Sequence, residues 1–395
     1  MGPFHTASDD EIKKGLTTDI YFKRTVEILK RKNVKKRVVA EFTVGSLPDN
    51  YPWAVFAGLE YVARLLEGLP VNLYSIPEGT LFTPRDPEGI PVPVMFIEGE
   101  YSVFSEFETP ALGFICQASG IATKSARIKK VAGDSVVLSF GVRRMHPALA
   151  PFIDRNAYIG GCDGVSSILG AEAIGKRPTG TMPHALMLVM GEEEAWKAYD
   201  EVIPQDIPRI ALIDTFGDEK FAALEAASKI KDLLGVRLDT PASRRGNMER
   251  IVKEVRWELN LRGFENVRIY VSGGLDEDDI PPLKKAGAFG FGVGTSISNA
   301  PTIDFAMDIV EVEGIPLAKK GKFSGKKKVW RCNNCLTLKV TSNNVDSVKC
   351  FSCGQNMELM LVQYIENGKM VRPLPTVDEI RSYVLTQIQR VDLQI

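Results

Sequence analysis

The sequence predicts an α/β protein built around parallel β/α units, with a sandwich domain before them and a cysteine-bearing module after them. Three observations favour this fold class. Short apolar runs such as Val136–Phe140, Arg209–Ile213 and Val267–Val271 end in polar or glycine-bearing turns, and most lead into helical stretches. Runs of this length between amphipathic helices are typical of parallel strands. Short strands separated by Pro/Gly turns precede them, and two Cys-x2-Cys pairs follow them.

The same patterns suggest domain boundaries. We expect a sandwich domain (1–112), a β/α barrel domain (113–302), a return segment packing on the N-terminal domain (303–328), and a zinc-binding module with a terminal helix (329–395). In the first domain, short strands are expected at Arg37–Glu41, Val71–Ile76 and Val92–Glu98. A long helix of small residues over Thr109–Ala132 should open the barrel domain, where Val236–Leu238 and Phe289–Val293 continue the strand rhythm.

Composition excludes several classes of protein. The chain has 49 basic and 50 acidic residues, which argues against a protein whose main task is electrostatic binding of nucleic acid. No apolar run approaches the roughly 20 residues of a membrane span, and the first residues lack the apolar core of a signal peptide. We therefore expect a soluble, cytoplasmic protein.

Unusual polar residues recur where the expected barrel strands end. They are Arg143, His184, Asp214, Asp239, Gly274 and Thr295. In β/α barrels the chemistry lies at the carboxyl ends of the strands. Taken alone, an Asp or Thr would be explained as a helix N-cap, and His184, one of only three histidines, as a satisfied turn residue. Their recurrence in one layer favours a catalytic site, because a histidine beside a carboxylate is readily poised as base or nucleophile.

Two cysteine pairs indicate a metal site near the C-terminus. Cys332 and Cys335 form one Cys-x2-Cys pair, and Cys350 and Cys353 form the other. Two such pairs on tight turns suit tetrahedral Zn²⁺, and four protein ligands leave no open position, so the zinc should be structural. Two local disulfides, or a knuckle that has lost its metal, are the alternatives. A zinc ribbon can also bind nucleic acid, but aromatic stacking residues are few here.

Eight motifs, in this order along nearly the whole chain, resemble those of the nicotinate phosphoribosyltransferases, in the short form with a C-terminal zinc knuckle. They are TTDIY (Thr17–Tyr21), SFGVRR (Ser139–Arg144), GTMPH (Gly180–His184), LIDT (Leu212–Thr215), VRLDT (Val236–Thr240), SGGLDE (Ser272–Glu277), FGVGTS (Phe291–Ser296) and Lys322-Phe323-Ser324. The resemblance implies an open-faced α/β sandwich beside an incomplete β/α barrel, followed by a small zinc-knuckle domain. It also implies formation of nicotinate mononucleotide and diphosphate from nicotinate and 5-phosphoribosyl 1-diphosphate, in NAD biosynthesis, with Mg²⁺ and ATP.

The resemblance assigns candidate roles by position. Catalytic candidates are His184, Asp214 and Asp239; nicotinate-binding candidates are Tyr21, Phe140, Arg143, Thr181 and Arg237; phosphoribosyl diphosphate-binding candidates are Arg144, Ser243, Gly273, Gly274, Gly294, Thr295 and Lys322. The chemistry of these residue types agrees. Glycine-rich turns before helices offer backbone N–H groups to a phosphate. An arginine fork suits the carboxylate of nicotinate.

Two further expectations follow from the family. His184 would accept a phosphoryl group from ATP, oriented by Asp214, and would favour product formation without joining the bond being made. Tyr21 matches a ring partner that comes from the neighbouring subunit, which implies a homo-oligomer, at least a dimer, with shared active sites.

One departure leaves the pyridine substrate open. Asp163 is expected where nicotinamide-using relatives hold the amide, and a carboxylate there would repel nicotinate. Nicotinamide is therefore an alternative substrate. Quinolinate fits less well, because its relatives lack the histidine turn and carry more basic residues for a second carboxylate. The non-enzyme alternative is a zinc-ribbon protein that binds nucleic acid.

Overall fold

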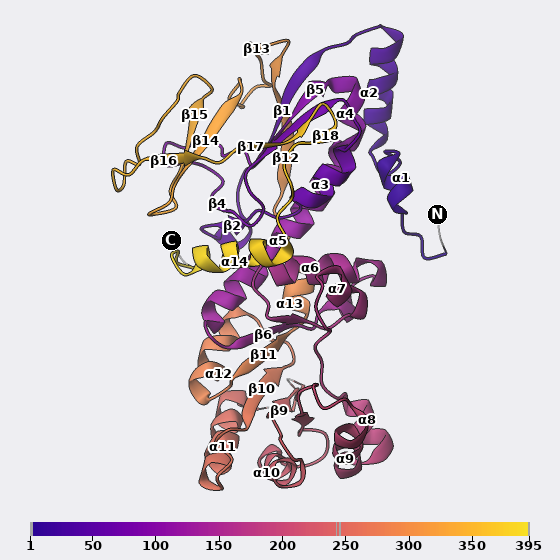
Figure 1. The fold of residues 1–395 in the computed structure, drawn as a ribbon, viewed down its shortest axis with the longest axis vertical. Coiled ribbons are helices and arrows are strands. Elements are labelled where there is room, and N and C mark those ends of the chain that lie inside the picture. Colours follow the sequence, from indigo (N-terminus) through magenta and orange to yellow (C-terminus); the bar gives the residue numbers. More distant parts are fainter. Residues whose placement is uncertain (1–2, 242, 245, 394–395) are drawn as a thin grey trace. The chain divides into compact units, whose positions relative to one another are not determined.

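The computed structural model describes residues 3–241, 243–244 and 246–393. The chain divides into two compact units (Figure 1). One is formed by Met1–Thr123 with Pro301–Ile395, and the other by Lys124–Ala300. Each unit is built on its own sheet, the first antiparallel and the second parallel.

The main sheet of the first unit has seven antiparallel strands. In spatial order they are β13 (Ile315–Pro316), β12 (Phe305–Val312), β1 (Arg37–Val44), β5 (Met95–Glu100), β3 (Val71–Ser75), β17 (Val362–Glu366) and β18 (Lys369–Met370). A two-stranded ribbon joins β2 (Ala54–Val55) to β4 (Leu81–Phe82). The segment after the barrel thus returns to this unit, because β12 pairs with β1.

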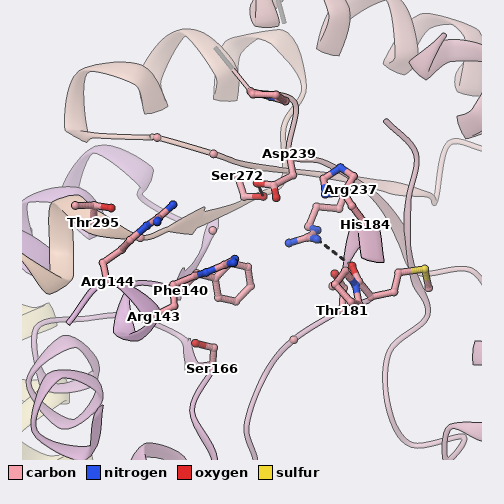
Figure 2. A pocket seen from close by; sticks show the side chains of 18 of the residues that line it. Phe140, Arg143, Arg144, Ser166, Thr181, His184, Arg237, Asp239, Ser272 and Thr295 are labelled. Atoms are coloured by element: carbon pink, nitrogen blue, oxygen red, sulfur yellow. Dashed lines mark hydrogen bonds between the residues drawn. The ribbon is translucent and has the colours of Figure 1, made fainter. Parts of the chain in front are cut away.

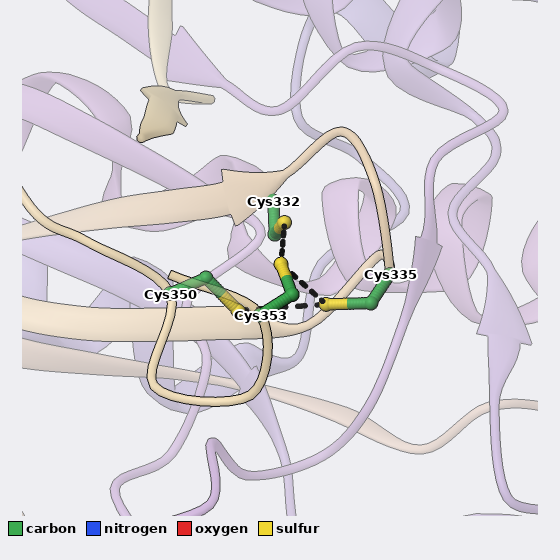
Figure 3. A group of neighbouring side chains, drawn as sticks. All are labelled: Cys332, Cys335, Cys350 and Cys353. Carbon is green, nitrogen blue, oxygen red and sulfur yellow. Dashed lines mark hydrogen bonds between the residues drawn. The ribbon is translucent and has the colours of Figure 1, made fainter. Parts of the chain in front are cut away.

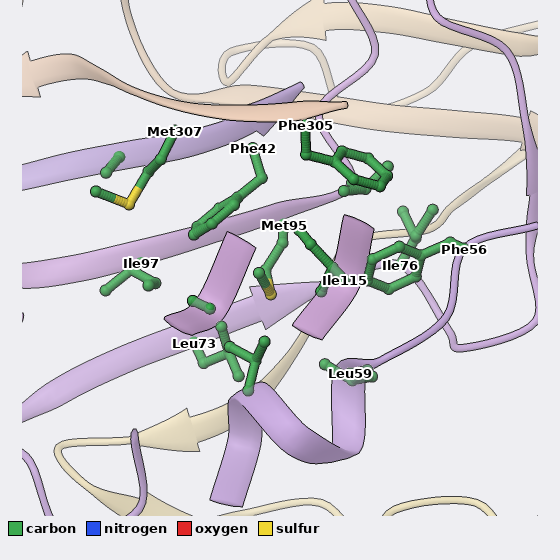
Figure 4. Packing of buried hydrophobic residues seen from close by; sticks show 14 of the residues in the cluster. Phe42, Phe56, Leu59, Leu73, Ile76, Met95, Ile97, Ile115, Phe305 and Met307 are labelled. Atoms are coloured by element: carbon green, nitrogen blue, oxygen red, sulfur yellow. The ribbon is translucent and has the colours of Figure 1, made fainter. Parts of the chain in front are cut away.

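The core of this unit lies between the sheet and two helices (Figure 4). Phe42 of β1, Leu73 of β3 and Met95 of β5 pack with Leu59 of α3 and Ile115 of α5, and all five are buried. Burial of such apolar side chains is the main force that holds a domain together. The helices here are α1 (Asp9–Lys13), α2 (Ile20–Arg31), α3 (Leu59–Leu66), α4 (Tyr101–Phe104) and α14 (Val377–Ile388), while α5 (Glu108–Ala132) begins in this unit and continues into the next.

The C-terminal part contains a small sheet of order β15-β14-β16, formed by β14 (Lys327–Cys332), β15 (Leu338–Ser342) and β16 (Met357–Leu359). The residues that follow do not stay in this module. Strands β17 and β18 extend the seven-stranded sheet beside β3. This pairing covers an edge of β3 that would otherwise expose unpaired backbone groups.

The second unit holds a six-stranded, wholly parallel sheet. Its order is β7 (Gly164–Val165), β6 (Val136–Ser139), β11 (Gly290–Val293), β10 (Arg268–Ser272), β9 (Gly235–Leu238) and β8 (Ile210–Leu212). The helices are α6 (Ala150–Ile159), α7 (Ile168–Ala173), α8 (His184–Met190), α9 (Glu192–Val202), α10 (Glu219–Lys229), α11 (Met248–Leu261), α12 (Ile280–Ala286) and α13 (Thr295–Ser298). Parallel neighbours need such crossovers. Because β7 and β8 each have one neighbour, the barrel is incomplete.

The fold class expected from the sequence is confirmed: an incomplete parallel barrel, an N-terminal domain and a small C-terminal domain with clustered cysteines. Among the described residues, no helix combines the length and the apolar character needed to cross a membrane.

Candidate active site

A cavity of about 760 Å³ lies at the carboxyl ends of the parallel strands (Figure 2). Its size is that of a small-molecule pocket. Residues of the second unit line it: Phe140, Arg143, Arg144, Ser166, Gly180, Thr181, Met182, Pro183, His184, Ala185, Arg237, Asp239, Pro241, Ser272, Gly273, Gly274, Gly292, Gly294 and Thr295. The polar layer at the strand ends is therefore assembled in one place.

Phe140 gives the cavity an aromatic face. It follows the last residue of β6, and its ring lies against the adjacent strand β11. A Cβ atom on Gly292 of β11 would stand 2.5 Å from Phe140 Cδ2, so this ring position requires glycine there. The strand pair thus positions a flat apolar surface suited to an aromatic ligand.

Two glycine turns form another wall. Gly273 and Gly274 follow β10 with φ angles of 98° and 69°, which favour glycine over other residues. Gly294 follows β11 and precedes Thr295, the first residue of α13. Successive backbone N–H groups in such turns make concave sites for anions. This wall can accept a phosphate group.

Asp239 is the carboxylate among the described lining residues. It follows β9, and its Oδ1 accepts a hydrogen bond of 2.7 Å from the hydroxyl of Ser272 at the end of β10. The carboxylate is thereby held between two neighbouring strand ends, where it can attract a cation or hydroxyl groups. Ser272 was not singled out from the sequence, although it directly precedes the Gly273-Gly274 pair.

His184 begins helix α8 and contacts Asp214 at the end of β8. His184 Nε2 lies 3.1 Å from Asp214 Oδ1. The Asp214 side chain is 0% exposed and that of His184 is 34% exposed. Asp214 Oδ2 accepts hydrogen bonds from the Asp239 backbone N–H, at 2.6 Å, and from the Thr240 hydroxyl, at 2.7 Å. The carboxylate is thus fixed by its neighbours, and it fixes the imidazole in turn.

Arginines supply positive charge to the cavity. Arg143 and Arg144 stand on the turn after β6, and Arg237 projects from β9. Arg237 Nη2 donates to the carbonyl of Met182 at 3.0 Å, which ties β9 to the GTMPH turn. Burial lowers the pKa of the Arg237 guanidinium below its ordinary value, and the nearby carboxylates Asp239 and Asp214 oppose that shift.

Two buried polar atoms in the wall lack hydrogen-bond partners within the described part of the chain. They are Arg237 Nε and Thr181 Oγ1. Buried polar atoms are nearly always paired, and a buried atom without a partner is unfavourable. An anionic ligand group in the cavity would supply the missing acceptor.

The expected position of Asp163 beside the pyridine was wrong. Its Oδ2 accepts a hydrogen bond of 2.9 Å from Val137 N, near the start of β6, and pairs with Lys129 at 2.8 Å. It lies at the amino end of the strand and is absent from the described lining. Ser166, three residues later, lines the cavity instead. The hydroxyl of Ser166, and not the carboxylate of Asp163, therefore belongs to the described lining of the cavity.

Three candidate residues lie elsewhere in the chain. Tyr21 is on α2 of the first unit, 56% exposed, with its ring centroid 4.4 Å from that of Phe22. Lys322, also in the first unit, pairs with Asp308 at 2.7 Å. Ser243 is exposed and is not among the described lining residues. The roles expected of these three remain predictions.

The four cysteines of the C-terminal part form a cluster (Figure 3). All four sulfur atoms lie within 4.8 Å of one another. The shortest contacts join the two pairs rather than the members of one pair: 3.4 Å between Cys332 and Cys353, and 3.4 Å between Cys335 and Cys350. Zn–S bonds of ~2.3 Å in a tetrahedron place sulfurs about 3.8 Å apart. The cluster has the donors and the spacing for such an ion.

Comparison with known proteins agrees with this architecture. Residues 19–119 match the quinolinate phosphoribosyl transferase N-terminal domain and residues 121–308 match its C-terminal domain. Residues 337–395 match the nicotinate phosphoribosyltransferase C-terminal domain. Together these matches and the half-barrel define a type II phosphoribosyltransferase.

Comparison with individual relatives identifies the family within this class of enzymes. A solved structure from Pyrococcus furiosus, named nicotinate-nucleotide pyrophosphorylase, is 52% identical over 100% of both chains, with a TM-score of 0.95. A nicotinate phosphoribosyltransferase of Bacillus subtilis is 29% identical over 376 residues, covering 82% of this chain and 74% of that protein. Human nicotinic acid phosphoribosyltransferase shares the fold, with a TM-score of 0.77, 19% identity, and coverage of 95% of this chain and 94% of that one. The chain belongs to the nicotinate phosphoribosyltransferase family, and it is an enzyme of that type.

Proposed function

We propose that this enzyme joins nicotinate to 5-phosphoribosyl 1-diphosphate, forming nicotinate mononucleotide and diphosphate in NAD salvage. The observation that carries the proposal is the single cavity that combines an aromatic face, glycine turns, arginines and the His184–Asp214 pair. In the reaction, the ring nitrogen forms a bond to the ribose carbon while the bond from that carbon to the diphosphate oxygen breaks. Each wall of the cavity suits one part of this chemistry.

Nicotinate fits the wall formed by Phe140, Thr181 and Arg237. The pyridine would stack on the Phe140 ring, and its carboxylate would accept hydrogen bonds from the unpaired Arg237 Nε and Thr181 Oγ1. A charged acceptor next to a buried guanidinium gains strength from the low local dielectric. Arg143 stands near enough to the ring wall to line the same cavity and adds positive charge.

Phosphoribosyl diphosphate fits the glycine turns and the remaining charged residues of the cavity. The turns at Gly273-Gly274 and Gly294-Thr295 would bind its 5′-phosphate through backbone N–H groups. Arg144 would hold the diphosphate, and Lys322 and Ser243 are further candidates for it. Asp239 is positioned for the ribose hydroxyls or for a Mg²⁺ ion that accompanies the diphosphate and neutralises its charge.

His184 would couple the reaction to ATP. Since Nε2 faces the buried carboxylate of Asp214, the proton belongs on Nε2, and Nδ1 keeps a lone pair. Nδ1 would attack the γ-phosphorus as the bond to the leaving ADP oxygen breaks. Hydrolysis of the phosphohistidine then releases phosphate and restores the imidazole, which favours product without joining the glycosidic bond.

The alternatives have less support. Nicotinamide would leave Arg237 facing an uncharged amide, and the carboxylate expected to hold that amide, Asp163, lies at the other end of β6. Quinolinate would bring a second carboxylate into the cavity. The name of the Pyrococcus furiosus protein describes cleavage of a nicotinate nucleotide by diphosphate, which breaks the same bond. The histidine pair favours the ATP-coupled nicotinate reaction.

We also propose a dimer with shared sites and one structural zinc. Tyr21 is exposed on its own unit, so its ring is available to the site of a second copy. Zinc fits the four sulfurs, because the closest contacts cross between the two pairs, whereas local disulfides would place the shortest contact within each pair. It would stabilise the ribbon and take no part in the reaction.

The test is a product assay with labelled phosphoribosyl diphosphate and Mg²⁺, offering nicotinate, nicotinamide and quinolinate in parallel. We expect nicotinate mononucleotide and diphosphate, stimulated by ATP. Preferential turnover of either other pyridine would replace the proposed substrate.

A further inference from the structure

Asp154 is a buried carboxylate that lies behind the cavity wall. It stands on α6, its side chain is 0% exposed, and it is absent from the described lining. Oδ1 accepts a hydrogen bond of 3.0 Å from the hydroxyl of Ser139. Oδ2 accepts two from Ser167, at 3.1 Å from the backbone N–H and 2.5 Å from the hydroxyl. One side chain therefore joins two separate segments.

Each of these two serines is the direct sequence neighbour of a residue that lines the cavity. Ser139 ends β6 and is followed by Phe140, while Ser167 follows Ser166 and caps α7. Phe140 and Ser166 both line the cavity. The parallel pairing of β6 with β7, with Ser139 opposite Val165, already brings these segments together, and Asp154 adds a side-chain tie between them next to Phe140 and Ser166.

The packing around this carboxylate leaves little freedom. A Cβ atom on Gly170 of α7 would stand 2.5 Å from Asp154 Oδ2, so the glycine lets the helix approach. Burial raises the pKa of Asp154, and the hydrogen bonds from Ser167 and Ser139 oppose that shift. A buried polar group is unfavourable unless it is well bonded, and a satisfied network specifies one arrangement of the segments it joins.

We propose that Asp154 is a positioning residue that fixes the width of the pyridine pocket by tying Ser139, the residue before Phe140, to Ser167, the residue after Ser166. The inference rests on the proposed function, since it assigns this wall to the pyridine. Asp154 touches neither substrate. Its effect should fall mainly on nicotinate binding, because the glycine turns proposed for the 5′-phosphate follow β10 and β11 and make no hydrogen bond to Asp154 within the described residues.

The experiment compares Asp154→Ala, Asp154→Asn and a matched control, Asp163→Ala. Asp154→Ala removes all three hydrogen bonds and should raise the KM for nicotinate about tenfold or more, with the KM for phosphoribosyl diphosphate within about twofold. Asp154→Asn should restore most of the affinity, because Oδ1 can accept from Ser167 N while Nδ2 donates to the Ser139 hydroxyl. Asp163→Ala removes a comparable carboxylate from the other end of β6 and should leave both KM values within about twofold.

Each result distinguishes a positioning role of Asp154 from a general structural role. Equal rises in both KM values, or the same change in Asp163→Ala, would show a general structural role and overturn the proposal. If Asp154→Ala fails to fold, Ser139→Ala decides, because it removes one hydrogen bond only: about a threefold rise in the nicotinate KM supports the proposal, and no rise contradicts it. If the wild-type enzyme makes no nucleotide from nicotinate, the proposed function itself has failed, and this inference fails with it.

Discussion

His184 Nε2 lies 3.1 Å from Oδ1 of Asp214, whose other oxygen is held by Asp239 N and the Thr240 hydroxyl. The pair joins the start of α8 to the end of β8. Because the fixed carboxylate engages Nε2, a phosphoryl group should be carried on Nδ1. Nuclear magnetic resonance of ¹⁵N-histidine-labelled phosphoenzyme distinguishes the two isomers, and phosphate on Nε2 would contradict this geometry.

Replacing Arg237 should weaken the binding of nicotinate far more than the binding of nicotinamide. Arg237→Gln removes the buried charge that faces the proposed carboxylate, so the KM for nicotinate should rise about 10- to 100-fold. Steady-state kinetics with each pyridine measure the difference. Arg177→Gln is the control, because that arginine is 76% exposed and pairs with Asp206 outside the cavity. An equal loss for both pyridines would mean that Arg237 only holds the Met182 carbonyl.

Tyr21 should act in the site of a second copy. Mixing inactive Tyr21→Ala with inactive Asp239→Ala and re-equilibrating the subunits should restore up to about a quarter of wild-type activity, since half the dimers are hybrids with one complete site each. Mixing Arg237→Ala with Asp239→Ala should restore none, because both changes fall in the same unit of the chain. Recovery in neither mixture would refute shared sites.

The cysteine cluster should hold one Zn²⁺ per chain. Elemental analysis of freshly reduced protein measures the stoichiometry. Cys350→Ser, or removal of the metal with a chelator, should lower Tm, because a shared ion would hold the two cysteine-bearing turns together. The KM values should change little where the protein stays folded. Metal-free protein with an unchanged Tm would count against the site.

Glu108 should make the first unit less stable as pH rises. Burial raises its pKa to about 7, with Asp308 adding to the shift and Lys319 opposing it. The folded state therefore binds a proton more tightly than the unfolded chain, so stability falls as pH rises from ~4.5 to ~7, where the folded state still holds the proton that the unfolded chain has released. Glu108→Gln should lose this dependence and be more stable than wild type at pH 8 by about 1 kcal/mol. Equal Tm values for the wild type and Glu108→Gln at pH 8 would contradict this prediction.

The sequence predicts several lining residues of the cavity because parallel strands place their carboxyl ends at one edge of the sheet. Asp214 and Asp239 follow β8 and β9 as the strand rhythm indicates, whereas His184 follows no strand but begins α8, and only the fold brings it to Asp214. Ser166 could not be predicted from that rhythm, because β7 has only two residues and a strand that short leaves no periodic signal. Asp163 was expected in the pocket from its likeness to nicotinamide-using relatives, yet it lies at the opposite end of β6.

Pairing between strands far apart in the chain also cannot be predicted from a local sequence pattern. The run that becomes β17 reads as part of the cysteine module, yet it pairs with β3, nearly three hundred positions earlier in the chain. Asp154 shows the same limit, since only the fold brings Ser139 and Ser167 to one carboxylate.

The account depends most on His184 as the residue that links ATP to nucleotide formation. Enzyme incubated with γ-labelled ATP and Mg²⁺ should acquire an acid-labile, base-stable phosphate on this residue. His184→Ala should acquire none and keep only a slow, ATP-independent reaction. Asp214→Asn should be labelled about 10²-fold more slowly.

The most direct measurement follows the label after isolated phosphoenzyme is mixed with both substrates. We predict that nicotinate and phosphoribosyl diphosphate release it as inorganic phosphate while nicotinate mononucleotide forms, and that quinolinate in place of nicotinate yields no nucleotide. Label on His5 or His146, or nucleotide formation that leaves the His184 phosphate in place, would contradict the account.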